Sequence, residues 1–237
     1  MNQMKETMSV FKEVFEMPNE YKQNMYANDD LKTCRKFTSS LRYETEKVHL
    51  WRDSLRHPSH PLDQWQHLWP ENPITYRECV GDFSVKIKEL GWRIMDLISE
   101  GLGLQRLSKH KDPYLITILM QDDVSGLQVL KDGKWITVEP LPGAFVVNIG
   151  HLLEIISKGK LKSAEHRAVT NSSHTRTSAA FFIAPLDDCL IEPAEDLTDE
   201  NNQPILKSFK YKEFLKQFFN TLGDSYLLLK SFEAPKN

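Results

Sequence analysis

Residues 115–149 read LITILMQDDVSGLQVLKDGKWITVEPLPGAFVVNI, and this stretch decides the fold class. Short runs of Val, Ile, Leu and Thr alternate here with the turn signals Asp132-Gly133 and Pro142-Gly143. Short apolar runs bounded by such turns are typical of β-strands. Within this stretch the predicted strands cover residues 115–120, 127–130, 135–138 and 144–149. Two further strands are predicted after it, at residues 164–170 and 177–184. Many short strands at close intervals favour a sandwich, a barrel or a jelly roll.

Helical patterns flank this strand-rich region on both sides. Apolar residues recur at helical spacing over residues 8–15, and again from Thr75 until Gly101 and Gly103 end a long predicted helix. Phenylalanines after Lys207 predict closing helices. Residues 51–73 are rich in Pro, His and Trp, which predicts an ordered loop. Its tryptophans, interpreted as packing anchors, are Trp51, Trp65 and Trp69. The predicted fold is therefore mainly β with flanking helices and a largely helical N-terminal half.

The bulk composition excludes several classes of protein. With 237 residues, 40% of them hydrophobic, the chain can bury a sizeable core. A net charge of −3 gives no reason to expect a nucleic-acid or membrane partner. The 3 cysteines form no C-x-x-C pair, and no apolar run approaches the roughly 20 residues of a membrane helix. The polar N-terminus does not read as a signal peptide. We expect a cytoplasmic, monomeric protein.

Two histidines and an aspartate could form a metal site. His110 and Asp112 are two residues apart, so an extended strand would direct both side chains to the same face. His166 lies in a later strand-like run. Two imidazoles and one carboxylate can occupy one face of an octahedral Fe(II) and leave the other face open. Each motif alone is weak, because a single strand histidine is more often a hydrogen-bonded core residue than a ligand.

Arg176 and Ser178, shortly downstream, suit a carboxylate-bearing co-substrate. They share one face of the last predicted strand with Ala180 and Phe182. A buried arginine needs an anionic partner, which a carboxylate held by both arms of the guanidinium would provide. An Arg-x-Ser pair by itself has little specificity. His57 and His60 lie in the proline-rich loop without a distant third ligand, and we interpret both as structural.

Longer matches make the chain resemble the plant-type iron(II)/2-oxoglutarate-dependent dioxygenases. The branch with flavonol synthase-like and hyoscyamine 6-hydroxylase-like enzymes is the most similar. The matching text spans residues 107–113, 116–122, 126–135, 138–150 and 165–171, with further matches at 51–53, 69–70 and 100–104. The resemblance implies a double-stranded β-helix, or jelly roll. It divides the chain into an N-terminal helical and loop region (1–106), an oxygenase core (107–190) and a C-terminal helical tail (191–237).

The resemblance also implies roles for single residues. The family's iron ligands fall on His110, Asp112 and His166, and its residues for the distal carboxylate of 2-oxoglutarate fall on Arg176 and Ser178. The implied cofactor is Fe(II), with 2-oxoglutarate and O2 as co-substrates and ascorbate as an optional addition. Hydroxylation, desaturation or demethylation of a small plant metabolite or hormone would release succinate and CO2. Two residues are expected to line the substrate pocket, Phe182 and Tyr43.

The chain departs from the family pattern in several places. An N-terminal segment is expected to be missing, and only Gln105-Arg106 stands where the family has a linker and a strand with an Asn-x-Tyr-x-x-Cys-type motif. His151 replaces a usual Asp, and Lys158 replaces a usual Asn. Losing a barrel strand would leave an open sheet edge. Two alternatives to an active oxygenase therefore stay open: a truncated or splice-variant member with impaired catalysis, and a non-catalytic jelly-roll binding module.

Overall fold

A computed structural model describes residues 2–23, 25, 34–39, 49–103, 115–194, 206–221 and 225–233 of the chain. Its helices are α1 (Asn2–Glu16), α2 (Asn19–Gln23), α3 (Leu62–Trp65), the 3-10 turn η2 (Gln66–Leu68), α4 (Tyr76–Gly101), α5 (His151–Ile156), α6 (Tyr211–Asn220) and α7 (Ser225–Lys230). Its strands are β1 (Arg35–Thr38), β2 (Asp53–Arg56), β3 (Ile116–Gln121), β4 (Leu127–Lys131), β5 (Lys134–Val138), β6 (Val146–Ile149), β7 (His166–Ala168), β8 (Ser178–Ile183), β9 (Leu190–Ile191) and β10 (Phe209–Lys210).

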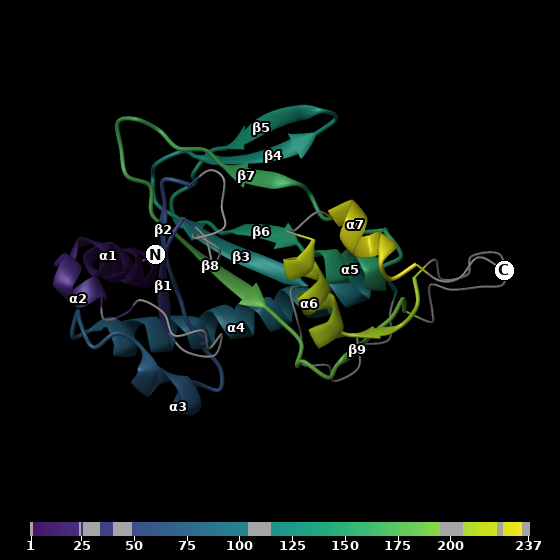
Figure 1. Cartoon of the computed structure of the whole chain (residues 1–237), viewed down its shortest axis with the longest axis horizontal. Coiled ribbons are helices and arrows are strands. Elements are labelled where there is room, and N and C mark those ends of the chain that lie inside the picture. The colour runs from purple at the N-terminus through teal and green to yellow at the C-terminus, as the bar shows by residue number, and fades with distance from the viewer. Residues whose placement is uncertain are drawn as a thin grey trace.

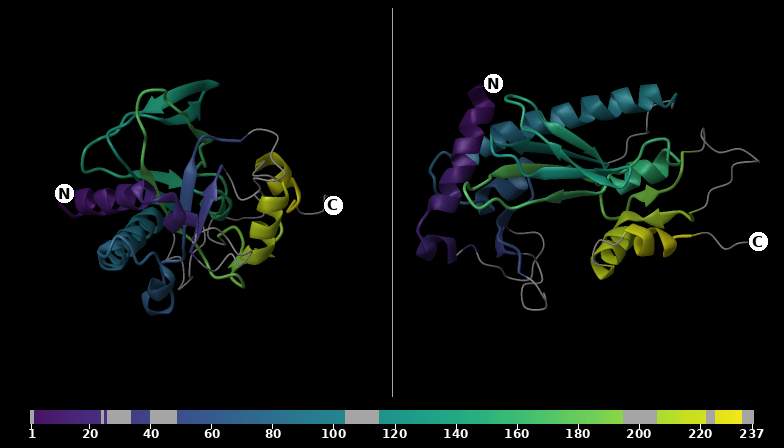
Figure 2. Two further views of the ribbon diagram at one scale, coloured as in Figure 1. Left: turned by 60° about the vertical axis from the view of Figure 1, so that its left-hand side comes forward. Right: turned by 90° about the horizontal axis from the view of Figure 1, so that it is seen from above.

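Six strands build two three-stranded antiparallel sheets. One sheet has the order β6-β3-β8 and the other the order β5-β4-β7. In Figure 1 the β5-β4-β7 sheet lies above the β6-β3-β8 sheet, and Figure 2 shows the same arrangement after rotation. The chain alternates between the two sheets, as a jelly roll requires. A complete jelly roll has about eight strands, so the two sheets do not close a barrel within the described part of the chain.

The long helix α4 covers one face of the β6-β3-β8 sheet. Phe83 of α4 meets Phe181 of β8 edge-on, with ring centroids 5.6 Å apart. Gly91 lies so close to the sheet that an added Cβ would come within 3.0 Å of the side chain of Ile183. Because side chains alternate along a strand, Ser178, Ala180 and Phe182 point to the opposite face of β8. The residues on that face of β8 are exposed, whereas those facing α4 are more covered.

The C-terminal helices close one end of the molecule, as the sequence predicted. The rings of Phe209, Phe214 and Phe232 pack together, with the centroids of Phe209 and Phe232 4.2 Å apart. These rings belong to the same buried cluster as Ile116 and Ile118 of β3. Helices α6 and α7 lie at the end of α4 opposite to α1 (Figure 2). The core thus draws on residues from the beginning, the middle and the end of the chain.

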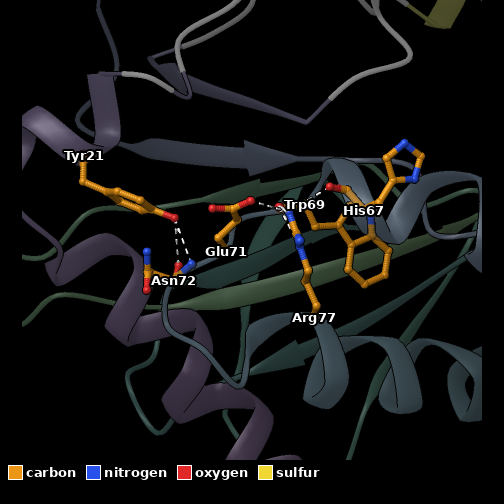
Figure 3. Close-up of polar contacts among 6 residues, drawn as sticks. All are labelled: Tyr21, His67, Trp69, Glu71, Asn72 and Arg77. Carbon is orange, nitrogen blue, oxygen red and sulfur yellow. Dashed lines mark hydrogen bonds and ion pairs between the residues drawn. The ribbon is translucent and has the colours of Figure 1, made fainter.

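The segment predicted as an ordered loop, residues 51–73, contains strand β2 and the short helical turns α3 and η2. The start of α4 fixes the last part of this segment through Arg77 (Figure 3). Arg77 donates hydrogen bonds to the carbonyl oxygens of Trp69 and His67, with Nη2–O distances of 2.7 and 2.8 Å. The hydroxyl of Tyr21 accepts a hydrogen bond from the backbone N–H of Asn72 at 2.9 Å. Helix α2 and helix α4 therefore both fix this segment.

The three tryptophans of that segment differ in burial. Trp69 is 2% exposed, and its indole N–H donates a 2.9 Å hydrogen bond to the carbonyl of Pro58. Trp65 is partly buried. The prediction that Trp51 is a packing anchor is wrong, because this side chain is 93% exposed. In a segment without helix or strand periodicity, the sequence does not tell which aromatic side chain turns inward.

The other predicted elements agree with the structure to within a few residues. The predicted strands correspond to β3 to β8, and the long predicted helix is α4. Helix α5 was not predicted, although its Leu152 and Leu153 are fully buried. Across the described residues, no helix is both long enough and apolar enough to span a bilayer.

Candidate active site

The structure describes four of the seven residues assigned to the site from the sequence. His110 and Asp112 lie outside the described residues, as does Tyr43. His166 is the first residue of β7, Ser178 is the first residue of β8, and Phe182 lies further along β8. Arg176 precedes β8 by two residues. The site is therefore described through His166, Arg176, Ser178 and the residues around them.

His166 has the hydrogen bonding of a histidine that can bind a metal. It lies opposite Val129 in the pairing of β7 with β4, and its Nδ1 lies 3.1 Å from the carbonyl oxygen of Ala164. Because a carbonyl oxygen can only accept, this hydrogen bond needs the tautomer with the proton on Nδ1. That tautomer leaves the lone pair of Nε2 for a metal, and such a second hydrogen bond commonly orients histidine ligands.

The neighbour Arg167 points to the other side of the sheet, as the alternation predicted. Its Nε donates a 2.9 Å hydrogen bond to Gln128, and its guanidinium lies 4.1 Å from the ring centroid of Trp135. These contacts place Arg167 on the face opposite to His166. Arg167 is therefore paired within the sheet and is not a second candidate for binding a co-substrate.

Arg176 reaches across the end of β3 and β8. Its Nη2 donates a 2.9 Å hydrogen bond to Oε1 of Gln121, and its Nη1 lies 3.4 Å from Oγ of Ser178. Its Nε is buried and has no hydrogen-bond partner among the described residues. Burial lowers the pKa of Arg176 from its usual value, while the charge of Asp122 acts in the opposite direction. A half-buried guanidinium with an unsatisfied N–H beside a serine hydroxyl fits an incoming carboxylate.

Glycine at position 126 makes room for this arginine. A Cβ added to Gly126 would lie 2.7 Å from Cδ and 3.2 Å from Nε of Arg176, and 3.1 Å from the carbonyl oxygen of Val169. The backbone N–H of Val169 also donates a 2.8 Å hydrogen bond to the carbonyl of Gly126. Gly126 thus lies between Arg176 and the chain just after β7, so the segments that carry Arg176 and His166 approach each other at this residue.

Asp122 is a buried acid that the sequence did not single out. Its side chain is 3% exposed, and its two oxygens accept hydrogen bonds from the backbone N–H groups of Thr177 (2.8 Å) and Val124 (3.1 Å). Lys12 of α1 forms an ion pair with it at 3.2 Å. The sequence did not mark Asp122 as a site residue, because an acidic residue in a turn after a strand is common.

The histidines interpreted as structural are bonded to protein groups. Nε2 of His57 lies 2.8 Å from the hydroxyl of Tyr76, and Nε2 of His60 lies 3.1 Å from the carbonyl of Ser84. Burial lowers the pKa of His57 to about 4. In the described part of the chain, no three His, Cys, Asp or Glu side chains are grouped so that they could hold a metal ion. Two of the three expected ligands, His110 and Asp112, lie outside the described residues.

Comparison with known proteins identifies the family. Residues 88–185 match the model of the 2OG-Fe(II) oxygenase superfamily. Flavanone 3-dioxygenase 2 of Oryza sativa subsp. japonica is 37% identical over 96% of this chain and 75% of its own length. The chain belongs to the 2OG-Fe(II) oxygenase superfamily. Hyoscyamine 6-dioxygenase of Hyoscyamus niger is also similar to this oxygenase, with 35% identity over 93% of the chain and 76% of its own length.

Solved structures agree with this membership. A crystal structure of JOX2 in complex with 2OG, Fe and JA matches this oxygenase with a TM-score of 0.84 and 30% sequence identity. The match covers 99% of this oxygenase and 79% of the JOX2 chain. The predicted jelly-roll class is thereby confirmed, and so is the resemblance to plant dioxygenases. The binding-module and impaired-variant alternatives find no support in these comparisons.

One comparison also bears on the expected internal deletion. The match to the rice flavanone 3-dioxygenase 2 extends over 258 aligned positions, which exceeds the 237 residues of this oxygenase. The relative therefore has residues within the matched region that this chain lacks. All four outer strands of the two sheets, β5, β7, β6 and β8, have a single partner among the described residues, so the pairing does not locate the missing residues.

Proposed function

We propose that this oxygenase acts on a small plant specialised metabolite or hormone and converts 2-oxoglutarate to succinate and CO2. The observation that carries the proposal is the guanidinium of Arg176, whose buried Nε lacks a partner within the described residues and whose Nη1 lies 3.4 Å from Ser178. These groups are suited to one end of a dicarboxylate. The relatives named for flavanone and hyoscyamine, and the JOX2 structure with JA, support a small organic substrate.

In this proposal Arg176 and Ser178 bind the distal carboxylate of 2-oxoglutarate. His166 is one ligand of Fe(II), through the Nε2 atom that its hydrogen bond to Ala164 leaves free. His110 and Asp112 are the two further ligands. When bound, iron and 2-oxoglutarate supply the oxidising chemistry with O2. The residues of the chain bind and orient the co-substrate.

Phe182 and Tyr43 are proposed to line the substrate pocket. Phe182 is 51% exposed and lies on the same face of β8 as Ser178. A large apolar side chain on that face would cover a substrate held next to the metal. Cys34, Cys79 and Cys189 form no disulfide with one another, which supports the proposed reducing, cytoplasmic location. The expectation of a monomer stays a prediction, and so does the use of ascorbate.

Anaerobic titration with Fe(II) and 2-oxoglutarate tests the proposal directly. Chelation of iron by the 2-oxo acid is expected to give a weak visible absorption band. His166→Ala should abolish the band, whereas His67→Ala, which changes an exposed histidine away from the site, should leave it intact. A folded chain that gives no band would contradict the proposed function. A band that survives His166→Ala would contradict the assigned ligand.

Product analysis then tests the substrate class. The chain is incubated with Fe(II), 2-oxoglutarate and O2, together with a flavanone, a tropane alkaloid or a jasmonate. Succinate formed in excess over the reaction without substrate, with a product whose mass is 16 units higher for hydroxylation or 2 units lower for desaturation, identifies the accepted class. Equal succinate with and without every compound would rule out these three classes.

A further inference from the structure

Around Arg176, three residues far from it in sequence restrict where its side chain can lie. Gln121 accepts a hydrogen bond from its Nη2 at 2.9 Å. Gly126 has no side chain at the point where Cδ and Nε of the arginine pass. Asp122 accepts a hydrogen bond from the backbone of Thr177, the next residue in the chain, at 2.8 Å. We call Gln121, Asp122 and Gly126 the arginine frame.

Gly126 limits the path of the arginine side chain. An alanine at this position would bring its Cβ to 2.7 Å from Cδ of Arg176, a distance that real Cβ atoms essentially never show. The added Cβ cannot move away from Arg176 either, because the backbone carbonyl oxygen of Val169 would already lie 3.1 Å from it. That carbonyl belongs to a segment hydrogen-bonded to Gly126 itself. The side chain of Arg176 must therefore shift in the alanine variant.

Asp122 fixes the backbone from which the arginine extends. Its two oxygens are used by different N–H groups, those of Thr177 and Val124. An asparagine has one oxygen and one NH2 group, so it can accept only one of these bonds with the same geometry. Lys12 of α1 forms an ion pair with the buried carboxylate of Asp122, and 40% of the lysine side chain is exposed. The backbone at Thr177 is in this way tied to a helix at the edge of the molecule.

We infer that Asp122 and Gly126 are positioning residues for Arg176, and that they set the affinity of this oxygenase for the distal carboxylate of its 2-oxo acid. The inference rests on the proposed function, in which Arg176 binds that carboxylate. Asp122 and Gly126 are not proposed to contact the co-substrate themselves. Each acts by holding the guanidinium in place, and a displacement of about 1 Å is enough to lose most of a bidentate interaction.

The test measures dissociation constants of two 2-oxo acids by calorimetry, with the Fe(II)-loaded chain in the absence of O2. The first acid is 2-oxoglutarate. The second is 2-oxopentanoate, which has a methyl group in place of the distal carboxylate and the same 2-oxo acid end. For the unsubstituted chain we expect tighter binding of 2-oxoglutarate. The ratio of the two constants reports the carboxylate site alone, because a general loss of folding or of metal affects both acids.

Gly126→Ala and Asp122→Asn should each weaken the binding of 2-oxoglutarate by about tenfold or more. The binding of 2-oxopentanoate should change by less than about twofold. The matched controls are Gly101→Ala, where an added Cβ would have no neighbour within 4 Å, and Asp123→Asn, which changes the exposed neighbour of Asp122. Both controls should leave the ratio unchanged.

The outcomes separate this inference from the proposed function. If Arg176→Met leaves the ratio of the two constants unchanged, or if the unsubstituted chain does not distinguish the acids, the proposed role of Arg176 is wrong and the inference falls with it. If Arg176→Met abolishes the preference but Gly126→Ala and Asp122→Asn retain it, only the positioning role is overturned. Equal losses for both acids in these two variants would likewise overturn it, because that result describes a merely structural defect.

Discussion

Gln121 and Ser178 are directly opposite each other in the antiparallel pairing of β3 with β8, and Arg176 contacts both side chains. The arginine thus bridges the ends of two strands that are more than fifty residues apart in the sequence. Its described hydrogen bonds go to neutral oxygens, and the charge of the nearby Asp122 also acts on it. Since no carboxylate is hydrogen-bonded to the guanidinium in the described contacts, it can still bind an anionic ligand directly.

This relationship predicts the effect of placing a carboxylate inside the protein. Gln121→Glu should form an ion pair with Arg176 and compete with 2-oxoglutarate, which weakens its binding by about tenfold. Calorimetric titration of the Fe(II)-loaded chain measures this change. Gln128→Glu is the control, because Gln128 accepts a hydrogen bond from Arg167 on the other face of the second sheet. Unchanged affinity in Gln121→Glu would contradict the assigned carboxylate site.

Lys158 adopts a backbone conformation that disfavours lysine. Its φ is 50°, and Gly159 follows with a φ of 74°, where helix α5 ends. The left-handed conformation costs a residue with a Cβ roughly 1–2 kcal/mol, and Asn tolerates it better. Lys158→Asn should therefore raise the free energy of unfolding by about 0.5 kcal/mol. Chemical denaturation measures it, and Lys160→Asn, two residues on, should show no gain.

His57 predicts a loss of stability in acid. Burial lowers its pKa to about 4, from 6.5 for a histidine in water. Between these two values the unfolded chain binds a proton that the folded chain does not. Stability is therefore fully present above about pH 6.5 and decreases as the pH falls toward 4, by up to about 3 kcal/mol. Denaturation curves at several pH values should show a shallower decline in His57→Gln.

The exposed His67 provides the control for this pH dependence. His67→Gln should keep the acid decline of the unsubstituted chain, since its side chain is exposed. If His57→Gln and the unsubstituted chain lose stability in parallel over this range, another group causes the acid sensitivity.

Arg77 predicts a difference between arginine and lysine at the start of α4. Its Nε and Nη2 reach two backbone carbonyls, those of Trp69 and His67, and Nη2 also lies 3.5 Å from Glu71 (Figure 3). A lysine keeps the charge but cannot reproduce the planar fork. Arg77→Lys should lower the free energy of unfolding by about 1–2 kcal/mol. Arg93→Lys, on the exposed side of the same helix, should change it little; an equal loss would contradict a role for the fork.

The sequence predicted those features that a local repeat encodes. The long helix α4 follows from apolar residues at helical spacing, and its end follows from Gly103, whose φ is 71°. The strands β3 to β8 follow from short apolar runs between turns. Helix α5 escaped prediction because its six residues are too few to show a helical period. Trp51 and Trp69 look alike in sequence, yet only Trp69 has neighbours that bury it.

At the candidate site, the sequence alone predicted which histidines bind a metal, and it determined that Arg176 and Ser178 have the spacing of residues on one face of a strand. Spacing sufficed because neighbouring side chains on a strand alternate in a fixed way. Only the tertiary structure decided what surrounds the arginine. Asp122 and Gly126 lie at least fifty residues before Arg176, and their contacts with it and with Thr177 exist because β3, β4 and β8 meet at one end of the two sheets. No local pattern records such a meeting, since it depends on how distant segments pack.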